Sequence, residues 1–479
     1  MRYIVTPQEM RAAEQAAFDR GVSSLLLMET AARQAFEALR ETAPAGGKTV
    51  FLCGPGNNGG DGLAMARMWR LAGGQSAVVL PEPPRTPDAQ VNLRYVQALG
   101  IPILDQSPGE ADAIVDALFG TGFRGAVDRD SAMGRLIAWA NSLKSPILSV
   151  DIPSGMDGLT GAAEGLCVRA DQTVTFHAAK RGLIFTPCPE NVGKLLIADI
   201  GLPHREGISW ADDLAELLPP RRANAHKGDC GRVLIFAGNL GMAGAAQMAA
   251  AACLRAGSGL VTVVCPREII PILQKTVPNA MCRAAEEQPE IRCDVKLFGC
   301  GLSETEESWQ ALLRLHHDGE REVWDAGALN LLAKHPMALG EVAVITPHLG
   351  EAARLLGWSI DQIALDPPQA AHALVKKYHC GVVLKSAASV ICGADGQLAV
   401  NALPAPALAK GGSGDALAGI LASLLGQGLP PMTAMQAACL WHSLAGRLAG
   451  EKYGVRSALT GDVIQCLGDA ENSYGGNAT

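Results

Sequence analysis

Short apolar runs alternate with amphipathic helical patterns along almost the whole chain. This alternation is typical of α/β proteins, in which helices cover both faces of a mostly parallel sheet. In the first half the apolar runs predict strands at residues 49–53, 77–80, 113–116, 147–151, 173–176 and 195–198. In the second half they predict strands at residues 232–237, 260–265, 295–298, 322–325, 342–345 and 381–385. The pattern therefore predicts the α/β class for both halves.

The alternation is interrupted between about Leu202 and Arg222, where the sequence is charged, contains prolines and shows no clear long element. A chain of 479 residues is also too long for one compact core. We therefore predict an N-terminal domain of residues 1–205, a linker at residues 206–221 and a C-terminal domain of residues 222–470. At the start of the chain, residues 6–39 predict one or two further helices, with Thr6 as a cap and Pro7 at the first helical position.

Composition narrows the class of protein. The chain is 48% apolar and 18% charged, as expected for a folded protein, and its net charge of −8 argues against a nucleic-acid polymer as partner. The 13 cysteines include no Cys-x-x-Cys motif, which predicts reduced, buried thiols. The most apolar long stretch, residues 241–264, contains Gln247 and Arg255 and predicts a buried helix followed by a strand. The first residues do not resemble a signal peptide, so we predict a cytoplasmic protein without a membrane partner.

The segment GPGNNGGDG at residues 54–62 follows a predicted strand and opens a helix. Glycine lets the backbone approach a ligand, and a helix N-terminus attracts a phosphate. The first six residues match G-x-G-x-x-G and Glu82 lies near the expected ribose position, so a Rossmann oxidoreductase is one interpretation. Asn57, Asn58 and Asp61 add oxygens that this fingerprint does not need and that suit a hard cation or sugar hydroxyls. The simplest alternative is a tight turn in which these side chains only cap the helix.

Two other predicted strands end in a similar way. The segment DALFGTGFRGA, residues 116–126, places Asp116 at a strand end before a glycine-rich loop. The segment VDIPSGMDG, residues 150–158, places Asp151 at the next strand end, with Ser154 three residues later. Ligands of open parallel sheets bind beyond the carboxyl ends of the strands. We therefore expect these three loops to converge on one site.

Together with TVTFHAAKRGL at residues 173–183, these motifs resemble the NAD(P)H-hydrate epimerase family over residues 8–200. The resemblance implies a Rossmann-like three-layer domain that interconverts the R and S epimers of hydrated NADH or NADPH at C6. It also implies a potassium ion held by Asn58, Asp116 and Ser154. The residues implied to contact the substrate are Asn57, Asn58, Gly59, Gly60, Asp61, Gly120, Thr121, Gly122, Phe123, Arg124, Gly125, Ala126 and Asp151. Ala32 stands where the family usually has Gly.

The implied substrate carbon carries both a hydroxyl and a ring nitrogen, so it is a hemiaminal. Its configuration inverts if hydroxide leaves and water returns on the other face, or if the ring opens briefly. Either route needs a proton shuttle, which typically contributes about 10²–10⁴-fold in rate. Asp151 is the first candidate for this shuttle, and Asp61 and Lys180 are weaker ones. The alternative for Lys180 is an exposed lysine after a strand, where it could pair with a phosphate.

In the second half, KGGSGD at residues 410–415 directly precedes a helical pattern. Consecutive N–H groups at a helix N-terminus form an anion hole for a phosphoryl group. Asp415 is suited to take a proton from an attacking hydroxyl. Taken alone, the motif is also compatible with a flexible turn that has a capping Asp, or with a small-molecule kinase.

Three further segments, at residues 226–263, 345–357 and 382–396, resemble the NAD(P)H-hydrate dehydratase family. The resemblance covers residues 222–466 and implies a ribokinase-like α/β domain. It implies that the S form is dehydrated to NAD(P)H, with phosphorylation of the C6 hydroxyl followed by loss of phosphate. Bacterial members fused to an epimerase typically use ADP, which would yield AMP and phosphate, whereas ATP is typical of eukaryotic members. Mg²⁺ is expected on the phosphates, and no carboxylate cluster in the sequence marks its ligands.

The resemblance also assigns residues to the second site. Those implied to line the nucleotide are Lys385, Ser386, Ala387, Ala388, Ser389, Gly411, Gly412, Ser413 and Gly414. Those implied to hold the hydrated nicotinamide are Ala245, Gly301, His348 and Asp415, with Asp415 as the catalytic base. For His348 the alternative is a hydrogen-bonded structural residue.

Several positions depart from the family pattern, among them Ser386, Ser389, Gly327 and Lys410. Lys410 puts a cation where a small hydroxyl residue is common. Two other functions stay open from the sequence: a ribokinase-like kinase, and a first half that only binds a nucleotide. The leading prediction is a bifunctional repair enzyme, expected to form a homo-oligomer.

Overall fold

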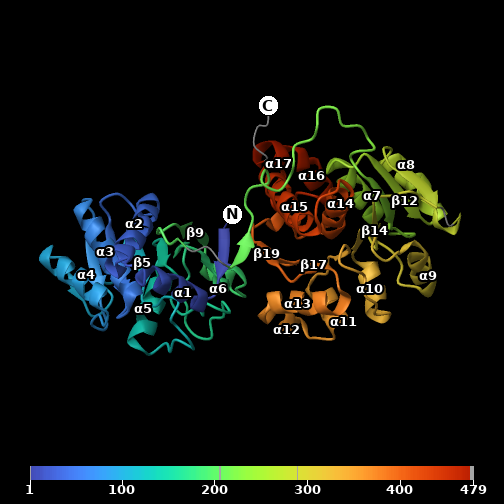
Figure 1. The fold of residues 1–479 in the computed structure, drawn as a ribbon. Coiled ribbons are helices and arrows are strands. Elements are labelled where there is room, and N and C mark those ends of the chain that lie inside the picture. The colour runs from blue at the N-terminus through green and yellow to red at the C-terminus, as the bar shows by residue number, and fades with distance from the viewer. Residues whose placement is uncertain (1, 204–206, 288–289, 475–479) are drawn as a thin grey trace. The chain divides into compact units, whose positions relative to one another are not determined.

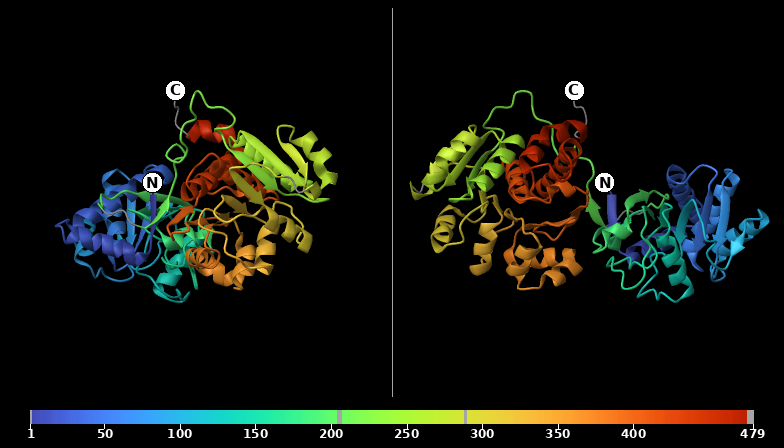
Figure 2. Two further views of the ribbon diagram at one scale, coloured as in Figure 1. Left: turned by 45° about the vertical axis from the view of Figure 1, so that its right-hand side comes forward. Right: turned by 180° about the vertical axis from the view of Figure 1, so that it is seen from behind.

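The structure is a computed structural model that describes residues 2–203, 207–287 and 290–474. The described residues divide into two compact units, Arg2–Ile208 and a second unit from Ser209 onward (Figures 1 and 2). Each unit has its own sheet and its own core. In the described part of the chain, no helix combines the length and the hydropathy needed to cross a membrane.

The N-terminal unit contains a parallel sheet of seven strands in the order β4-β3-β2-β5-β6-β7-β9. The strands are β2 Lys48–Cys53, β3 Gln75–Val79, β4 Ile103–Leu104, β5 Ala113–Ala117, β6 Ile147–Val150, β7 Gln172–Phe176 and β9 Lys194–Ala198. Side chains of β2 alternate between the two faces: Phe51 and Cys53 enter one core, and Val50 and Leu52 the other. The central strands are apolar on both faces because both faces are covered.

Helices cover both faces of this sheet (Figure 1). Apolar residues of α2 and α3 pack in the first core and those of α5 in the second, which gives three layers. The helices of this unit are α1 Pro7–Phe18, α2 Ser24–Thr42, α3 Asn57–Leu71, α4 Pro87–Ala98, α5 Ala132–Ser142 and α6 Arg181–Ile184. The predicted start of α1 is confirmed, because Thr6 and Glu9 form a reciprocal capping box and Pro7 is the first helical residue.

Two short strands that the sequence pattern did not indicate lie outside this sheet. They are β1, Arg2–Val5, and β8, Ala179–Lys180, and they pair in parallel with Val5 opposite Lys180. This pairing fixes the backbone of Lys180 beside the first strand of the chain.

The C-terminal unit contains a larger sheet in the order β13-β12-β11-β14-β15-β16-β17-β18-β19-β10. Its strands are β10 Ile208–Trp210, β11 Arg232–Phe236, β12 Leu260–Cys265, β13 Met281–Ala284, β14 Val295–Phe298, β15 Glu322–Trp324, β16 Val344–Ile345, β17 Gly381–Leu384, β18 Ser389–Cys392 and β19 Leu398–Asn401. The pairing is parallel except at β17-β18-β19, which are antiparallel. Strand β10 pairs with β19 through Ser209 and Trp210, so a strand lies within residues 206–221, where a linker without a clear element was expected.

Helices also cover both faces of this second sheet (Figure 1). Apolar residues of α7, α14 and α15 form one large core with the strands, while α9 to α13 lie on the other face. The helices are α7 Ala243–Arg255, α8 Ile270–Thr276, α9 Glu306–Leu315, α10 Gly327–Lys334, α11 Leu349–Leu356, α12 Ile360–Leu365, α13 Pro367–Tyr378, α14 Ser413–Gly426, α15 Pro431–Tyr453, α16 Thr460–Gln465 and α17 Leu467–Tyr474. All 13 cysteines are free, and 11 of them are buried, as predicted; Cys188 and Cys293 are only partly buried.

The turn between β2 and α3 allows a prediction about stability. A Cβ on Gly54 would lie 1.8 Å from the carbonyl oxygen of Leu118, whereas a Cβ on Gly56 would meet no atom within 4 Å. Gly54→Ala should therefore destabilise the N-terminal unit by at least about 1–3 kcal/mol, because the backbone of one loop must shift. Gly56→Ala is the matched control and should change the urea midpoint of that unit little. Equal midpoints for the two variants would contradict this account of the turn.

Two candidate functional sites at the strand ends

The first candidate site lies beyond the carboxyl ends of β2, β5 and β6, where the sequence placed it. The α3 N-terminus brings Asn58 against the loop after β5, and its Nδ2 donates a hydrogen bond to the carbonyl of Phe119 at 2.9 Å. A Cβ on Gly120 would lie 3.3 Å from both the Asn58 Cβ and an oxygen of Asp151. The three predicted loops therefore meet at these residues.

Asp151 occupies a strained position at the end of β6. Its φ is +69°, in the left-handed region that is uncommon for a residue other than Gly. Oδ2 accepts a hydrogen bond from the N–H of Thr121 at 3.2 Å, and Oδ1 accepts one from the Thr175 hydroxyl at 3.2 Å. Oδ1 also lies 2.8 Å from Lys180 Nζ. Neighbours from three segments thus hold the carboxylate in one orientation.

Lys180 is buried, so the interpretation of this residue as an exposed lysine is wrong. Its side chain is only 1% exposed. Besides the ion pair with Asp151, Nζ donates hydrogen bonds to the Thr175 hydroxyl at 2.9 Å and to the Phe176 carbonyl at 3.0 Å. These three acceptors match the three N–H donors of an ammonium group, so the buried Nζ has a partner for each.

This buried ion pair predicts a large effect of Lys180→Met on stability. Removing one member of a buried pair leaves an uncompensated charge and typically costs about 3–5 kcal/mol. The double variant Lys180→Met/Asp151→Asn should recover much of that loss, because no lone charge remains. Urea unfolding of the single and double variants measures the difference. A single variant as stable as the parent would show that the pair contributes nothing to folding.

Two more carboxyl groups lie close enough to interact electrostatically with this pair. Asp61 is 9% exposed, and burial, followed by the charges of Asp151 and Glu14, raises its pKa well above the usual value. Burial also raises the pKa of Glu14, opposed by Lys180 and reinforced by Asp151. Asp61 therefore favours its neutral, proton-donating form beside the ion-paired Asp151. Glu14, on α1, was not among the predicted site residues, because it lies in a helix far from the glycine-rich motifs.

The three predicted potassium ligands also come together. The Ser154 N–H donates to Asp116 Oδ2 at 2.8 Å, and the Ser154 hydroxyl accepts from the N–H of Phe119 at 2.9 Å. Asp116 is fully buried, and burial raises its pKa. Asn58 Oδ1 is buried and has no hydrogen-bond partner. An orphaned amide oxygen of this kind fits a cation ligand.

The predicted substrate loop at residues 120–126 is mostly exposed. Thr121 holds Asp151, and Phe123 stacks on Phe119 with ring centroids 4.8 Å apart. Arg124 lies 3.4 Å from Asp157 and is therefore already paired. The exposed residues of the loop are Gly122, Arg124, Gly125 and Ala126.

The second candidate site is built at the N-terminus of α14. Gly412 caps the helix with φ +89°, a conformation that favours glycine. The Thr460 hydroxyl donates to the Gly411 carbonyl at 3.0 Å, and Ser413 Oγ lies 3.4 Å from Nε2 of the buried His442. Burial lowers the pKa of His442 to about 4, so this ring is neutral. Lys410 Nζ donates to the Arg456 carbonyl at 2.7 Å, which gives this departure from the family pattern a role in fixing the loop.

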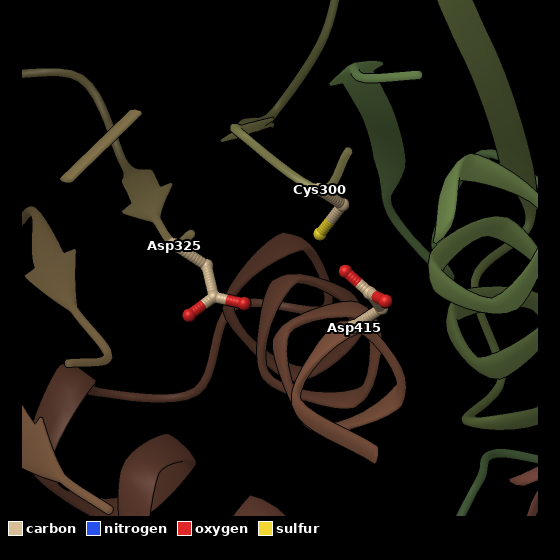
Figure 3. A group of neighbouring side chains, drawn as sticks. All are labelled: Cys300, Asp325 and Asp415. Carbon is tan, nitrogen blue, oxygen red and sulfur yellow. The ribbon is translucent and has the colours of Figure 1, made fainter. Parts of the chain in front are cut away.

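Asp415, in the first turn of α14, lies beside Asp325 and Cys300 (Figure 3). Burial and the nearby charge of Asp325 raise the pKa of Asp415 to about 6. Asp325 follows β15 and was not among the predicted site residues, although a carboxylate at a strand end was used as the signal in the first half. Lys385 pairs with Asp325 Oδ1 at 2.6 Å, and its Nζ would lie 3.2 Å from a Cβ on Gly414. This ammonium group therefore borders the predicted phosphate loop.

The predicted nucleotide segment at residues 385–389 forms the turn from β17 to β18. The hydroxyls of Ser386 and Ser389 donate to carbonyls within the turn, at 2.7 Å and 3.2 Å. Ser386 and Ala387 are exposed, whereas the Ala388 side chain is buried. Ser386 and Ala387 are therefore the residues of this turn that a nucleotide could reach.

The remaining predicted contacts of the second site lie on three elements. A Cβ on Gly301 would lie 2.8 Å from the Ala245 Cβ, so these two residues are neighbours. His348 caps α11, and its Nδ1 accepts hydrogen bonds from the N–H groups of Gly350 and Glu351 at 3.0 Å and 3.4 Å. Its side chain is otherwise 54% exposed. His348 therefore has the structural role of a hydrogen-bonded helix cap, and its contact with a substrate stays a prediction.

Comparison with known proteins identifies the family. Residues 24–182 match the family model described as YjeF-related protein N-terminus, and residues 233–467 match that of NAD(P)H-hydrate dehydratase. The bifunctional NAD(P)H-hydrate repair enzyme of Escherichia coli is 37% identical and covers 96% of this chain and 92% of its own. That of Moorella thermoacetica is 35% identical, with coverages of 97% and 96%. The chain belongs to the bifunctional NAD(P)H-hydrate repair enzyme family. This confirms the predicted family and enzyme class.

Solved structures agree for the second half of this family member. A ribokinase-like superfamily protein from Enterococcus faecalis is 28% identical with a TM-score of 0.51, covering 57% of this chain and 98% of its own. An ADP/ATP-dependent NAD(P)H-hydrate dehydratase from Bacillus subtilis, co-crystallised with ATP and Mg²⁺, has the same identity and TM-score, with coverages of 55% and 96%. The predicted ribokinase-like fold is confirmed.

Proposed function

We propose that this chain restores hydrated NADH and NADPH in two steps. The N-terminal unit interconverts the R and S epimers, and the C-terminal unit dehydrates the S epimer with ADP, releasing AMP and phosphate. The observation that carries the proposal is the presence of a proton-accepting carboxylate in each site. Asp151 is held by Lys180, and Asp415 lies in the first turn of α14 beside the predicted phosphate loop. Family membership supports both steps.

In the epimerase site, Asp151 and Asp61 divide the work of the proton shuttle. Asp61, neutral in its buried position, donates a proton to the departing hydroxyl, and Asp151 accepts one from the incoming water. Paired carboxyl groups with different environments are a common arrangement for acid and base roles. Asn57, which is the exposed residue of segment 57–61, and the exposed residues of segment 120–126 would then contact the substrate.

The orphaned oxygen of Asn58 supports a potassium ion in this site. Asn58, Asp116 and Ser154 would hold it, and it would supply positive charge near the phosphates or hydroxyls of the substrate. Both Asp116 oxygens already accept hydrogen bonds, from Ser149 and Ser154 on one side and Leu118 on the other. Asn58 is therefore the ligand whose replacement should weaken cation binding most directly.

In the dehydratase site, Asp415 takes the proton of the C6 hydroxyl as that oxygen attacks the terminal phosphate of ADP. N–H groups of residues 411–414 and the Lys385 ammonium stabilise the transferring phosphoryl group. The C6–O bond then breaks with the electron pair of the ring nitrogen pushing, and phosphate leaves in place of the poorer leaving group hydroxide. Loss of a proton from the neighbouring ring carbon C5 then forms the C5–C6 double bond of the neutral product NAD(P)H. Ala245, Gly301 and His348 would orient the nicotinamide ring.

Magnesium is expected to neutralise phosphate charge when the nucleotide binds. The cluster of Cys300, Asp325 and Asp415 includes a sulfur atom, whereas Mg²⁺ prefers oxygen ligands in octahedral geometry. The cluster therefore does not fit Mg²⁺.

A coupled assay tests the proposed function. The full chain is incubated with pure S or pure R epimer of hydrated NADH, with ADP, with ATP or without nucleotide, and the absorbance of NADH is followed. We expect ADP to support recovery from both epimers, and recovery from R to depend on the N-terminal site. The hydrated NADPH epimers are run in parallel. If neither ADP nor ATP restored NADH from the S epimer, the dehydratase assignment would be overturned.

A further inference from the structure

Cys300, Asp325 and Asp415 form a compact group of side chains with three different backbone origins. Cys300 follows β14, Asp325 follows β15, and Asp415 lies in the first turn of α14. One ligand atom from each, a sulfur and two carboxylate oxygens, lies within 4.8 Å of the other two. Figure 3 shows the three side chains pointing toward a common centre. The ends of two strands and the start of one helix thus position the three side chains.

The polar atoms of this group are not fully used by the protein. Asp325 is 1% exposed, and its Oδ1 binds Lys385 at 2.6 Å and the Thr346 hydroxyl at 2.8 Å. Among the described residues, its Oδ2 accepts no hydrogen bond. This oxygen is on the side of Asp325 that faces the phosphate loop, 3.7 Å from where a Cβ of Gly414 would lie.

The charges of the group suit a divalent cation. Without a metal, burial and the charges of Asp415 and Asp325 raise the pKa of the Cys300 thiol well above its usual value, so the sulfur keeps its proton. A bound cation would displace this proton, and the sulfur and the two carboxylates would then carry three negative charges against one positive charge on Lys385. The net charge is then −2, which one divalent cation neutralises. Without a cation, two carboxylates lie close together in a poorly solvated place, and their repulsion favours binding of a positive charge.

We propose that Cys300, Asp325 and Asp415 bind a thiophilic divalent cation such as Zn²⁺ or Co²⁺. Sulfur and carboxylate ligands in a set of three, with a fourth position open to water, are typical of zinc sites, whereas Mg²⁺ avoids sulfur. Binding releases the thiol proton to solvent, since a coordinating thiol is deprotonated. The site is therefore distinct in its chemistry from the Mg²⁺ that accompanies a nucleotide.

The proposed cation inhibits dehydration, and this consequence rests on the proposed function. A carboxylate of Asp415 that is bound to a metal cannot accept the proton of the C6 hydroxyl. The cation also lies beside the phosphate loop, next to Lys385 and Gly414. Cation binding itself does not depend on dehydratase activity, so the two ideas can fail separately.

Binding is tested with Co²⁺ on the metal-free full chain, because a thiolate bound to Co²⁺ gives a charge-transfer absorption band in the near ultraviolet. The parent protein should develop this band with about one equivalent of Co²⁺, and Cys300→Ala should lack it. The matched control is Cys380→Ala, which removes a buried thiol just before β17, at the opposite end of that strand from Lys385. Circular dichroism and urea midpoints verify that both variants fold. A band that persists in Cys300→Ala, or is missing in the parent, overturns the proposal.

Inhibition is tested with Zn²⁺ in the presence of excess Mg²⁺ and ADP, with each protein compared with its own zinc-free rate. The Zn²⁺ concentration that halves dehydration should rise at least about tenfold in Cys300→Ala and stay unchanged in Cys380→Ala. The epimerase rate is the internal control and should not respond. Equal sensitivity of the two variants would overturn the inhibitory site. A Cys300-dependent Co²⁺ band in a chain without dehydratase activity would instead leave the site standing and reject the proposed function.

Discussion

Replacing Asp415 by Asn should reduce the ADP-dependent dehydration of the S epimer by about 10²–10⁴-fold. The substitution keeps the size of the side chain and removes its ability to accept the C6 hydroxyl proton. Folding should be preserved, because the carboxylate is partly buried next to Asp325 and its charge is costly there. Recovery of NADH absorbance from pure S epimer and ADP measures the effect.

The epimerase activity of the same Asp415→Asn preparation is the internal control and should be unchanged, because its proposed residues lie in the other unit. Asp361→Asn is the matched control variant, since Asp361 is an exposed acidic residue in the first turn of α12. It should retain full dehydratase activity. A dehydration rate within a few fold of the parent in Asp415→Asn would show that another group accepts the proton.

Much of the first site was predictable from the rule that ligands of open parallel sheets bind beyond the carboxyl ends of the strands. Loops that follow neighbouring parallel strands must meet at one edge of the sheet, whatever their separation in sequence. Asp116, Asp151 and the turn at Asn58 were found in this way, and the structure brings them together. The same rule points to Asp325 after β15. Asp325 was not predicted, because β15 has only three residues and no long glycine-rich motif like those of the first half follows it.

Other features depend on contacts that no local pattern contains. Lys180 follows a strand and carries a charge, so its sequence context favours exposure. Its burial is decided by acceptors on β7 and by pairing of β8 with β1, some 175 residues earlier in the chain. Strands such as β1 and β10 are only 4 and 3 residues long, too short to show a period. Glu14 reaches the first site from a helix whose pattern carries no sign of chemistry.

Replacing Asp151 by Asn should slow epimerisation by about 10²–10⁴-fold, because the amide can orient water but cannot take its proton. The rate is measured as conversion of a pure epimer, after subtraction of the rate without enzyme. This substitution also leaves the Lys180 ammonium buried without its counterion, so the variant should be less stable as well as less active.

The loss of stability in Asp151→Asn must therefore be separated from the loss of catalysis, and the chain offers a way to do so. The double variant Asp151→Asn/Lys180→Met removes both charges, so it should regain much of the stability and none of the epimerase activity. Asp128→Asn, at an exposed aspartate in the loop before α5, is the matched control and should keep both properties. If the double variant recovered activity together with stability, Asp151 would act only by holding the fold. If it recovers stability alone, the buried ion pair orients a catalytic carboxylate, and the strained backbone at Asp151 belongs to the site that this carboxylate serves.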